Sequence, residues 1–383
     1  MAAAGHELYL TNDQGVRLGD SEGRNPLATF LWLRASRIVN GIGWIDVGMP
    51  KSFDTMLFLR RDFMIQLWRQ PKGGALSLWR PYFLRKWRYE TFDGIDSIII
   101  SGPCVNDLLR RRCVIAYAGS EESDKSDYAD DMMKEIVTES MSDSVDPTPD
   151  AGSRAWSLLS VAGDLGDGPS IEKGMAFKGP LLSPSGGGIL PSIARASRVA
   201  GTDLFFDIVA SSISASSIAL EFRTYTGQRG QDISSLLIFD EARGNMGNAF
   251  YEYDASEEIT YVYGAGQCEG AARNVQQVYD ADRYNASAWN RCEAVADARN
   301  EASDNAVREK ARDLLRDGEP VERAGGVLKD TKETKYGIHW NFGDKIKARY
   351  KGHEFLSVIN SMVLSVNTAG EQIVARWDYD SDV

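Results

Sequence analysis

Residues 260–282 read TYVYGAGQCEGAARNVQQVYDAD, and this stretch organises the interpretation of the whole chain. The β-branched and aromatic residues 259–263 predict a short strand. Three glycines that permit a tight turn come next: Gly264, Gly266 and Gly270. After them, apolar residues recur at the three-and-four spacing of a helix face, at Ala272, Val275, Val278 and Tyr279. The stretch therefore predicts a strand, a glycine hinge and the start of a helix.

A nucleotide-binding loop is the first alternative for these glycines. The spacing of Gly264, Gly266 and Gly270 fits the NADP-type dinucleotide turn, and Arg273 could meet a 2′-phosphate. Such a site requires a second parallel strand about 20 residues further on. Here Asp280 and Asp282 instead close the predicted helix. A structural hinge is therefore favoured, and a nucleotide-dependent enzyme remains the alternative function.

Composition places the chain among globular proteins. It has 383 residues, of which 43% are apolar and 10% aromatic, so it can form several domains with a sizeable core. We find no apolar run of about 18 residues that could span a bilayer, and the first 20 residues lack the features of a signal peptide. We expect a protein made in the cytoplasm, without a membrane anchor.

No catalytic, cofactor-binding or metal-binding residues are predicted. The four cysteines, at 104, 113, 268 and 292, form no C-x-x-C pair and are expected to be free thiols. Only three histidines are present, and no G-x-S-x-G, H-E-x-x-H or P-loop pattern occurs. Several carboxylate pairs could be drawn as an acid and base, but solvated charges explain them more simply: Glu257 with Glu258, Asp378 with Asp380, and Asp130 with Asp131.

The charge of the chain is acidic overall and unevenly distributed. A formal net charge of −12 argues against tight binding of nucleic acid. Residues 60–112 contain 11 Lys/Arg against 5 Asp/Glu, whereas residues 121–150 contain 11 Asp/Glu against 2 Lys. This asymmetry suits contact between subunits of opposite local charge, and two solvated faces are the other interpretation.

The first part of the chain predicts an antiparallel barrel or sandwich. Residues 1–25 are polar and are expected to form a loose arm. Strands separated by hairpin signals are then predicted at 28–39, 43–47, 55–59, 63–69, 77–88 and 97–101. Five tryptophans fall in this region, interleaved with arginines 69, 80, 85 and 88: Trp32, Trp44, Trp68, Trp79 and Trp87. They could stack bases, or sugars in a carbohydrate-binding β-protein, but use in the core or in a subunit interface is favoured.

The middle of the chain combines a helix with long loops. Residues 106–112 predict a short basic turn or helix, and 113–117 a strand. A helix is predicted over 125–141, with Tyr128, Met132 and Ile136 on its core face. Residues 143–197 are rich in Gly, Pro and Ser, and predict long loops with at most short strands. The main break between the two halves is expected here.

Strands return in the second half of the chain. They are predicted at 204–210, 218–224, 236–240, 249–254 and from 260, and then at 337–341, 345–350, 354–367 and 372–378. Two helices are expected between them, at 270–283 and at 291–316, with Gly318 ending the second. Gly343 with Asp344 predicts a tight entry to a barrel strand.

Together these patterns predict a β-rich α+β fold. It comprises two tube-like antiparallel β-barrel or sandwich domains, a loop-rich insertion and a helical pair. The expected segments are an arm (1–25), a first β domain (26–120), a helix with a loop-rich insertion (121–200), a second β region (201–265), a helical segment (266–330) and the strands that complete the second β domain (331–383).

Six short motifs, in a fixed order, resemble one known family. They are ISGPCVNDLLRRR (100–112), FRTYTGQRGQD (222–232), DEARGNM (240–246), VYGAGQCEGAAR (262–273), RCEAVADAR (291–299) and FGDKI (342–346). With these motifs the chain resembles the tail-hub, or baseplate hub, proteins of siphovirus-type bacteriophages, which are related to the central hub protein of contractile-tail phages. The resemblance covers about residues 26–377.

This resemblance implies a structural virion protein without enzymatic activity. It implies a homotrimer whose subunits each supply two tube-like β-domains to a pseudo-sixfold ring. Such a ring joins the tail tube to the tip and helps form or close the DNA channel. The implied neighbours are the distal tail protein, the tape measure protein and tail-tip or fibre proteins, with DNA passing through transiently. A net acidic chain suits such a channel because it repels phosphates.

Overall fold

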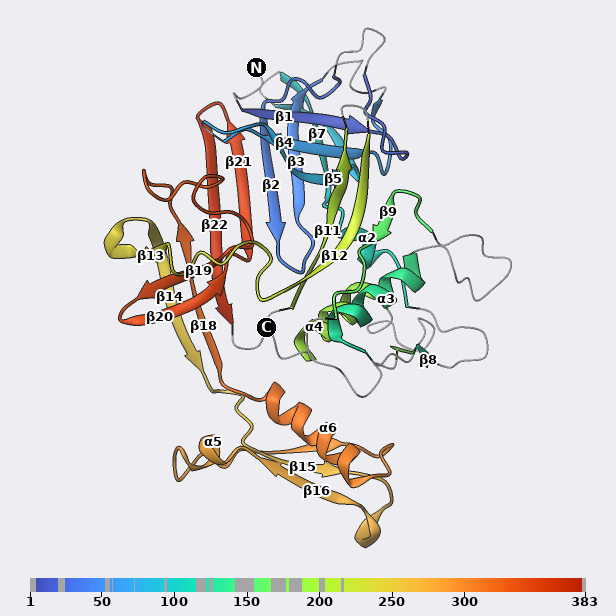
Figure 1. Ribbon diagram of the computed structural model, residues 1–383, viewed down its shortest axis with the longest axis vertical. Coiled ribbons are helices and arrows are strands. Elements are labelled where there is room, and N and C mark those ends of the chain that lie inside the picture. The colour runs from blue at the N-terminus through green and yellow to red at the C-terminus, as the bar shows by residue number, and fades with distance from the viewer. Residues whose placement is uncertain are drawn as a thin grey trace. The chain divides into compact units, whose positions relative to one another are not determined.

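The computed structural model describes residues 5–19, 25–51, 56, 58–71, 73–92, 95–114, 122–123, 127–141, 155–166, 177–178, 188–199, 204–214 and 217–380. Strands dominate these residues, most of them antiparallel and accompanied by few helices (Figure 1), which confirms the predicted β-rich α+β class. The chain forms two compact units. Unit 1 comprises 1–247 and 327–377, and unit 2 comprises 248–326 and 378–383. The six predicted segments stay a prediction about domains.

The main sheet of unit 1 joins strands from both ends of the chain. The sheet begins with β14 (Met246–Asp254) and β18 (Val321–Leu328). Six strands follow, each antiparallel to the next, in the order β22 (Gly370–Asp380), β21 (Ser361–Asn367), β2 (Trp32–Ile38), β3 (Trp44–Pro50), β7 (Ile95–Pro103) and β6 (Lys86–Phe92). One face is apolar and fully buried, with Ile45, Val47, Ile98 and Ile100 at its centre. The predicted period-two alternation therefore holds, and one face of the sheet forms the core.

A second sheet in unit 1 corrects the prediction of a loose N-terminal arm. Its order is β1 (His6–Thr11), β4 (Met64–Arg69) and β5 (Ser77–Phe83). β1 pairs with β4 along its whole length, and Leu8 and Leu10 are buried. The sequence HELYLT alternates polar and apolar residues, so one face of β1 enters the core.

Helices and a third sheet form the second core of unit 1. α3 (Ala129–Met141), α4 (Ile189–Val199) and α2 (Asp107–Arg110) share it with β11 (Leu204–Ile213), β12 (Ile218–Thr226) and β9 (Leu159–Val161). Two further strands, β8 (Glu122–Ser123) and β10 (Phe177–Lys178), pair with each other. Met132 and Ile136 are buried as predicted, whereas Tyr128 is exposed.

α4 was not predicted, because residues 143–197 were expected to contain only loops and short strands. Pro191 lies in the first turn of α4, where proline costs no hydrogen bond within the helix. Ile189 and Ile193 are fully buried in the core shared with α3. Of the strand predicted at 113–117, only Cys113 and Val114 are described, and Cys113 forms a bridge with Gly188. The rest of that prediction lies outside the described residues.

The C-terminal part of unit 1 contains β13 (Ile238–Asp240), β19 (Lys345–Tyr350) and β20 (His353–Val358), in one sheet. The predicted tight turn at Gly343 is confirmed, with a φ of +83°. Asp344 fixes it by accepting hydrogen bonds from the backbone N–H groups of Gln231 and Asn341, at 2.8 and 2.6 Å. β19 begins at the next residue.

Three strand predictions in unit 1 need correction. The strand at 337–341 is a turn closed by a hydrogen bond from the N–H of Gly337 to the carbonyl of Trp340. The strand at 354–367 is divided into β20 and β21 by a turn at residues 359–360. Of the strand at 55–59, Met56 and Phe58 are helical, while 55 and 57 lie outside the described residues.

Unit 2 is a three-stranded sheet with a helix on one face. Its elements are β14 (Met246–Asp254), β15 (Tyr261–Ala265), a 3-10 helix (Gly270–Ala272), β16 (Val275–Tyr279), α5 (Ala281–Asn285), β17 (Glu293–Asp297), α6 (Asp304–Asp317) and β18 (Val321–Leu328). The sheet order is β16-β15-β17, and Val262 and Ala296 pack against Ala311 and Leu315 of α6. The chain passes between the units within β14 and β18.

Both helix predictions in unit 2 are corrected by the structure. The helix at 270–283 is replaced by the 3-10 helix, β16 and the short α5. The helix at 291–316 starts only at Asp304, because Ser303 caps it by accepting a hydrogen bond from the N–H of Ala306. The residues before Ser303 include β17, which pairs with β15 in parallel. Gly318 follows the last turn, as predicted.

None of the helices in the described ranges is long and apolar enough to cross a bilayer.

Candidate assembly interface

β6 is the terminal strand of the main sheet of unit 1. It pairs with β7 on one side, and the described residues provide no strand on its other side. Its sequence, KWRYETF, alternates charged or polar residues with aromatic ones. Residues 85–89 are all exposed. β6 therefore offers a free row of backbone N–H and C=O groups, with distinct side chains on each face.

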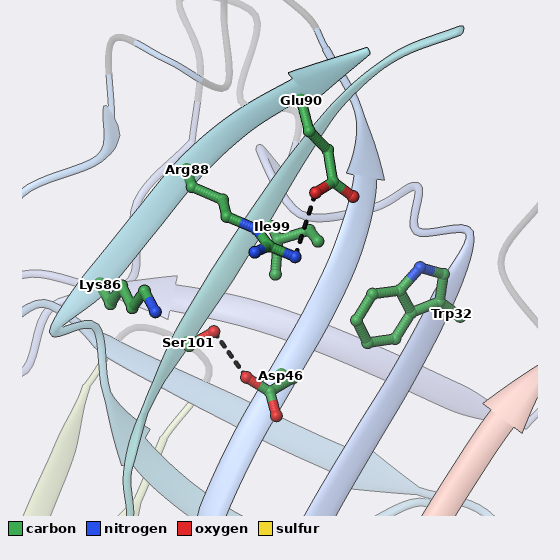
Figure 2. A pocket seen from close by; sticks show the side chains of 7 residues that line it. All are labelled: Trp32, Asp46, Lys86, Arg88, Glu90, Ile99 and Ser101. Carbon is green, nitrogen blue, oxygen red and sulfur yellow. Dashed lines mark hydrogen bonds and ion pairs between the residues drawn. The ribbon is translucent and has the colours of Figure 1, made fainter. Parts of the chain in front are cut away.

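One face of β6 is polar and borders a shallow hollow. Seven residues from β2, β3, β6 and β7 line this hollow of about 400 Å³ (Figure 2): Trp32, Asp46, Lys86, Arg88, Glu90, Ile99 and Ser101. Arg88 and Glu90 form an ion pair at 3.0 Å, and the Ser101 hydroxyl donates to Asp46 at 2.6 Å. Two basic and two acidic side chains therefore balance one another on this face.

The indole ring of Trp32 fits into this hollow because Gly48 has no side chain. A Cβ at Gly48 would lie 2.2 Å from Nε1 of Trp32, so only glycine lets the indole ring lie on the strand. Trp32 and Gly48 are register partners across β2 and β3. The polar face is thus flat and built on main-chain atoms at this point.

The other face of β6 continues the apolar core, but the described residues do not cover it fully. Trp87 lies opposite Ile100 and Tyr89 opposite Ile98 in the register with β7. Both isoleucines are fully buried, whereas Trp87 and Tyr89 are 37% and 47% exposed. Aromatic side chains that share a face with a buried core and remain exposed are typical of an interface that another chain completes.

A buried ion network connects β5 of the second sheet with β11 of the third sheet. Arg80 of β5 donates to both carboxylate oxygens of Asp207 of β11, at 2.9 and 2.6 Å, and Arg229 adds a contact of 2.9 Å. Burial alone would raise the pKa of Asp207, but the charges of Arg80 and Arg229 outweigh it and lower the pKa to about 2. Asp207 therefore stays ionised and holds β5 to β11.

A second ion network attaches β1 to the main sheet. Glu371 of β22 accepts hydrogen bonds from Nε and Nη2 of Arg69, both at 2.7 Å, and lies 2.6 Å from Nε2 of His6. Burial opposes ionisation of Glu371, but the hydrogen bonds from Arg69 and His6 outweigh it and lower its pKa to about 2. The network connects three strands: β1, β4 and β22.

The glycine stretch does not form a nucleotide-binding loop. A strand, β16, follows the 3-10 helix at Gly270, so the strand–loop–helix geometry of such a site is missing there. Gly264 and Gly266 instead let α6 approach the sheet. A Cβ on Gly264 would lie 2.8 Å from Val307, and one on Gly266 would lie 2.7 Å from it. The predicted hinge between a strand and a helix is therefore wrong: Gly264 lies within β15, and Gly264 and Gly266 serve helix–sheet packing.

The carboxylate pairs have different surroundings. Asp130 and Asp131, expected to be solvated, are buried in α3 with Lys134, whose Nζ lies 3.0 and 3.3 Å from them. They form a structural ion cluster. Glu257 is exposed in a turn as expected, whereas the side chain of Glu258 is only 7% exposed and lies 3.8 Å from Arg283. The side chains of Asp378 and Asp380 lie outside the described part of the structure.

The predicted tryptophan–arginine region is divided between core and surface. Trp79 is buried and donates to the hydroxyl of Tyr336 at 2.9 Å, which confirms a core role. Arg69 and Arg80 are engaged in the ion networks, so they do not interleave with exposed rings. Trp44 and Trp87 are exposed. The four cysteines form no disulfide, as predicted.

The sequence did not single out Trp87 and Tyr89 as a pair, because residues 77–88 were predicted as one strand. The chain turns at Leu84 and Arg85 without glycine, and β6 begins at Lys86. The alternation of KWRYETF was the available signal.

Comparison with solved structures shows the same fold in phage tail proteins. The 43 kDa tail protein of prophage MuSo2 from Shewanella oneidensis is similar, with 11% identity, a TM-score of 0.56, and coverage of 98% of this chain and 99% of that one. A tail protein from Neisseria meningitidis MC58 is similar with 10% identity and a TM-score of 0.54, covering 98% and 97%.

No protein-family model matches the chain, and no curated protein matches it. The likeness to the two tail proteins spans nearly the whole of each chain, so it includes both compact units. The predicted resemblance is therefore confirmed at the level of the fold, and this chain has the fold of these tail proteins.

Proposed function

We propose that the chain is a structural, non-enzymatic subunit of a bacteriophage-type tail, where it forms a trimeric hub at the tail tip. Two observations support the proposal. The fold is shared over almost the full length with two tail proteins. The exposed aromatic residues of β6 lie on the same face as a buried core.

In this proposal β6 is the contact that closes a ring. A strand of the neighbouring subunit pairs with the free edge of β6, and side chains from that subunit cover Trp87 and Tyr89. Main-chain hydrogen bonds give such a contact its register, and the two aromatic rings add apolar burial. Burial of the exposed part of each ring favours assembly by about 25 cal/mol for each Å² removed from water.

The polar face of the same sheet then lines the channel. Three subunits with two β regions each give the pseudo-sixfold ring that joins a tail tube to a threefold tip. The face in Figure 2 carries two basic and two acidic side chains, so it offers DNA no net positive charge. With a net charge of −12, the chain lets DNA pass without holding its phosphates.

The same proposal places the protein in the virion, next to other tail proteins. The neighbours would be the distal tail protein, the tape measure protein and tail-tip or fibre proteins. The basic segment 60–112 contains β4 to β7, and the acidic segment 121–150 contains α3. Opposite local charges on different parts of the chain favour the docking of subunits and steer their encounter.

Mass photometry of the purified protein at increasing concentrations tests the trimer. We expect trimers from the native chain and a trimer dissociation constant raised at least about tenfold by Tyr89→Glu, because a carboxylate would be buried in the contact. Leu236→Glu is the matched control, since Leu236 is exposed elsewhere in unit 1. Monomers only, for the native chain at every concentration, would contradict the proposal.

A further inference from the structure

The sheet of unit 2 has one face without a cover from the described residues. Val262 and Gly264 of β15 face α6, so Tyr261 and Tyr263 lie on the opposite face. The register adds Tyr279 and Gln277 from β16, and Glu293 and Val295 from β17. We call this face the tyrosine platform.

The aromatic rings of the platform form one continuous surface. The ring centroids of Tyr261 and Tyr263 are 5.0 Å apart, and Tyr261 stacks on Tyr279 at 5.4 Å with an interplanar angle of 7°. Tyr284 of α5 extends the group, 6.0 Å from Tyr279. Tyr279 remains 53% exposed. The rings of Tyr261 and Tyr279 stack on each other, so the exposed part of Tyr279 is the main apolar surface that the platform offers to a ligand.

Polar groups hold these rings in place and frame them. The Tyr261 hydroxyl donates to Gln277. Arg291 lies over the Tyr261 ring at 4.8 Å, donates to the Tyr263 hydroxyl at 3.1 Å and pairs with Glu293 at 2.5 Å. Since its charge is matched by Glu293, the platform combines fixed rings with donors and acceptors and carries no surplus charge.

The size of the platform suits a small ligand better than a folded partner. Three strands about 4.8 Å apart, with five paired residues at about 3.4 Å each, give a face of roughly 250 Å². A stable protein contact needs about 800 Å² from each partner. A hollow of about 540 Å³ lies along the edge of β16, lined by Tyr263, Val275 and Gln277 on the platform face and by Gln276 and Arg308 on the side of α6. Such a volume is typical of ligand sites.

The charge of unit 2 excludes polyanions as ligands. Residues 248–326 contain 9 Lys/Arg against 16 Asp/Glu, so nucleic acid would be repelled. A ligand for this platform needs apolar faces to stack on tyrosine, many hydroxyl or amide groups, and no negative charge. We propose that the tyrosine platform binds a neutral oligosaccharide.

An oligosaccharide array tests this proposal with the full-length protein. The array should hold neutral hexose and N-acetylhexosamine chains together with sulfated and uronic-acid chains, and the best neutral chain is then titrated by calorimetry. We expect saturable binding that Tyr279→Ala weakens at least about tenfold and Tyr279→Phe largely retains, because stacking needs the ring. Tyr253→Ala is the matched control, since Tyr253 is an exposed tyrosine of unit 2 outside the platform.

Two outcomes would overturn the proposal. One is that no neutral chain on the array binds. The other is that Tyr279→Ala and Tyr253→Ala bind with the affinity of the native protein. Circular dichroism of each variant checks that the fold is retained. We expect it to be retained, because Tyr279 is half exposed and its replacement should leave the sheet intact. The trimer measurement is independent of this test, since β6 and the platform belong to different units.

Discussion

Tyr89 and Ile98 are register partners on one face of the main sheet, yet Ile98 is fully buried and Tyr89 is 47% exposed. The apolar core of unit 1 therefore continues to β6, where the cover that the described residues provide is incomplete. This relationship is the main structural reason for proposing that another chain completes the sheet.

The glycines of β15 give a prediction about stability. A Cβ on Gly264 would lie 2.8 Å from both a methyl group and the carbonyl oxygen of Val307. Since α6 cannot approach as closely, Gly264→Ala should lower the free energy of unfolding by about 1–3 kcal/mol. Urea denaturation measures this value. Gly163→Ala, where a Cβ has open space, should change it by less than about 0.5 kcal/mol. Equal effects from both variants would contradict the packing role.

Asp207 gives a prediction about pH. Its folded pKa of about 2 is below the usual value of 3.8, so its contribution is present above pH 4 and is lost as the pH falls from about 4 to 2. The contribution is about 2–3 kcal/mol for a shift of this size. Urea denaturation from pH 7 to pH 2 measures it.

Replacing Asp207 should lower the free energy of unfolding by more than its pH-dependent contribution. Asp207→Asn leaves Arg80 and Arg229 buried without their counter-charge, so we expect a loss of about 3–5 kcal/mol at pH 7. The acid-dependent slope between pH 4 and pH 2 should also become shallower. An unchanged slope in Asp207→Asn would show that other carboxylates cause the acid sensitivity.

Glu371 gives a local prediction for β1. Glu371→Gln weakens the charged hydrogen bonds from Arg69 and His6, so β1 should open more often. Hydrogen exchange of the peptide 6–11 should become faster by about tenfold. Glu354→Gln breaks an exposed ion pair with Arg349 and should leave this peptide unchanged. Slow exchange in both variants would indicate that the sheet pairing alone holds β1.

The strands of the main sheet of unit 1 are largely predictable because one face of each is buried. HELYLT also follows this pattern, although its polar surroundings indicate an arm, whereas β4 is buried on both faces. The sequence does not separate β6 from β5, because the turn at Leu84 and Arg85 contains neither glycine nor proline. The alternation of KWRYETF places Trp87 and Tyr89 on one face, but only the register with β7 shows that this face continues a buried core.

The helix predicted after Gly270 failed for a different reason. Val275, Val278 and Tyr279 have helical spacing, but the stretch is too short for this spacing to distinguish a helix from a strand. Residues 275–279 form a strand because they pair with β15. This pairing depends on the residues of β15, which the helical pattern does not include. The tyrosine platform was likewise hidden, since Tyr261 and Tyr279 become neighbours only through that register.

Electron microscopy of the assembled protein tests the central claim most directly. A map that resolves strands should show a ring in which a strand of the neighbouring subunit pairs with the outer edge of β6 and covers Trp87 and Tyr89. A ring in which β6 faces solvent, or images of separate single subunits only, would contradict the proposed contact.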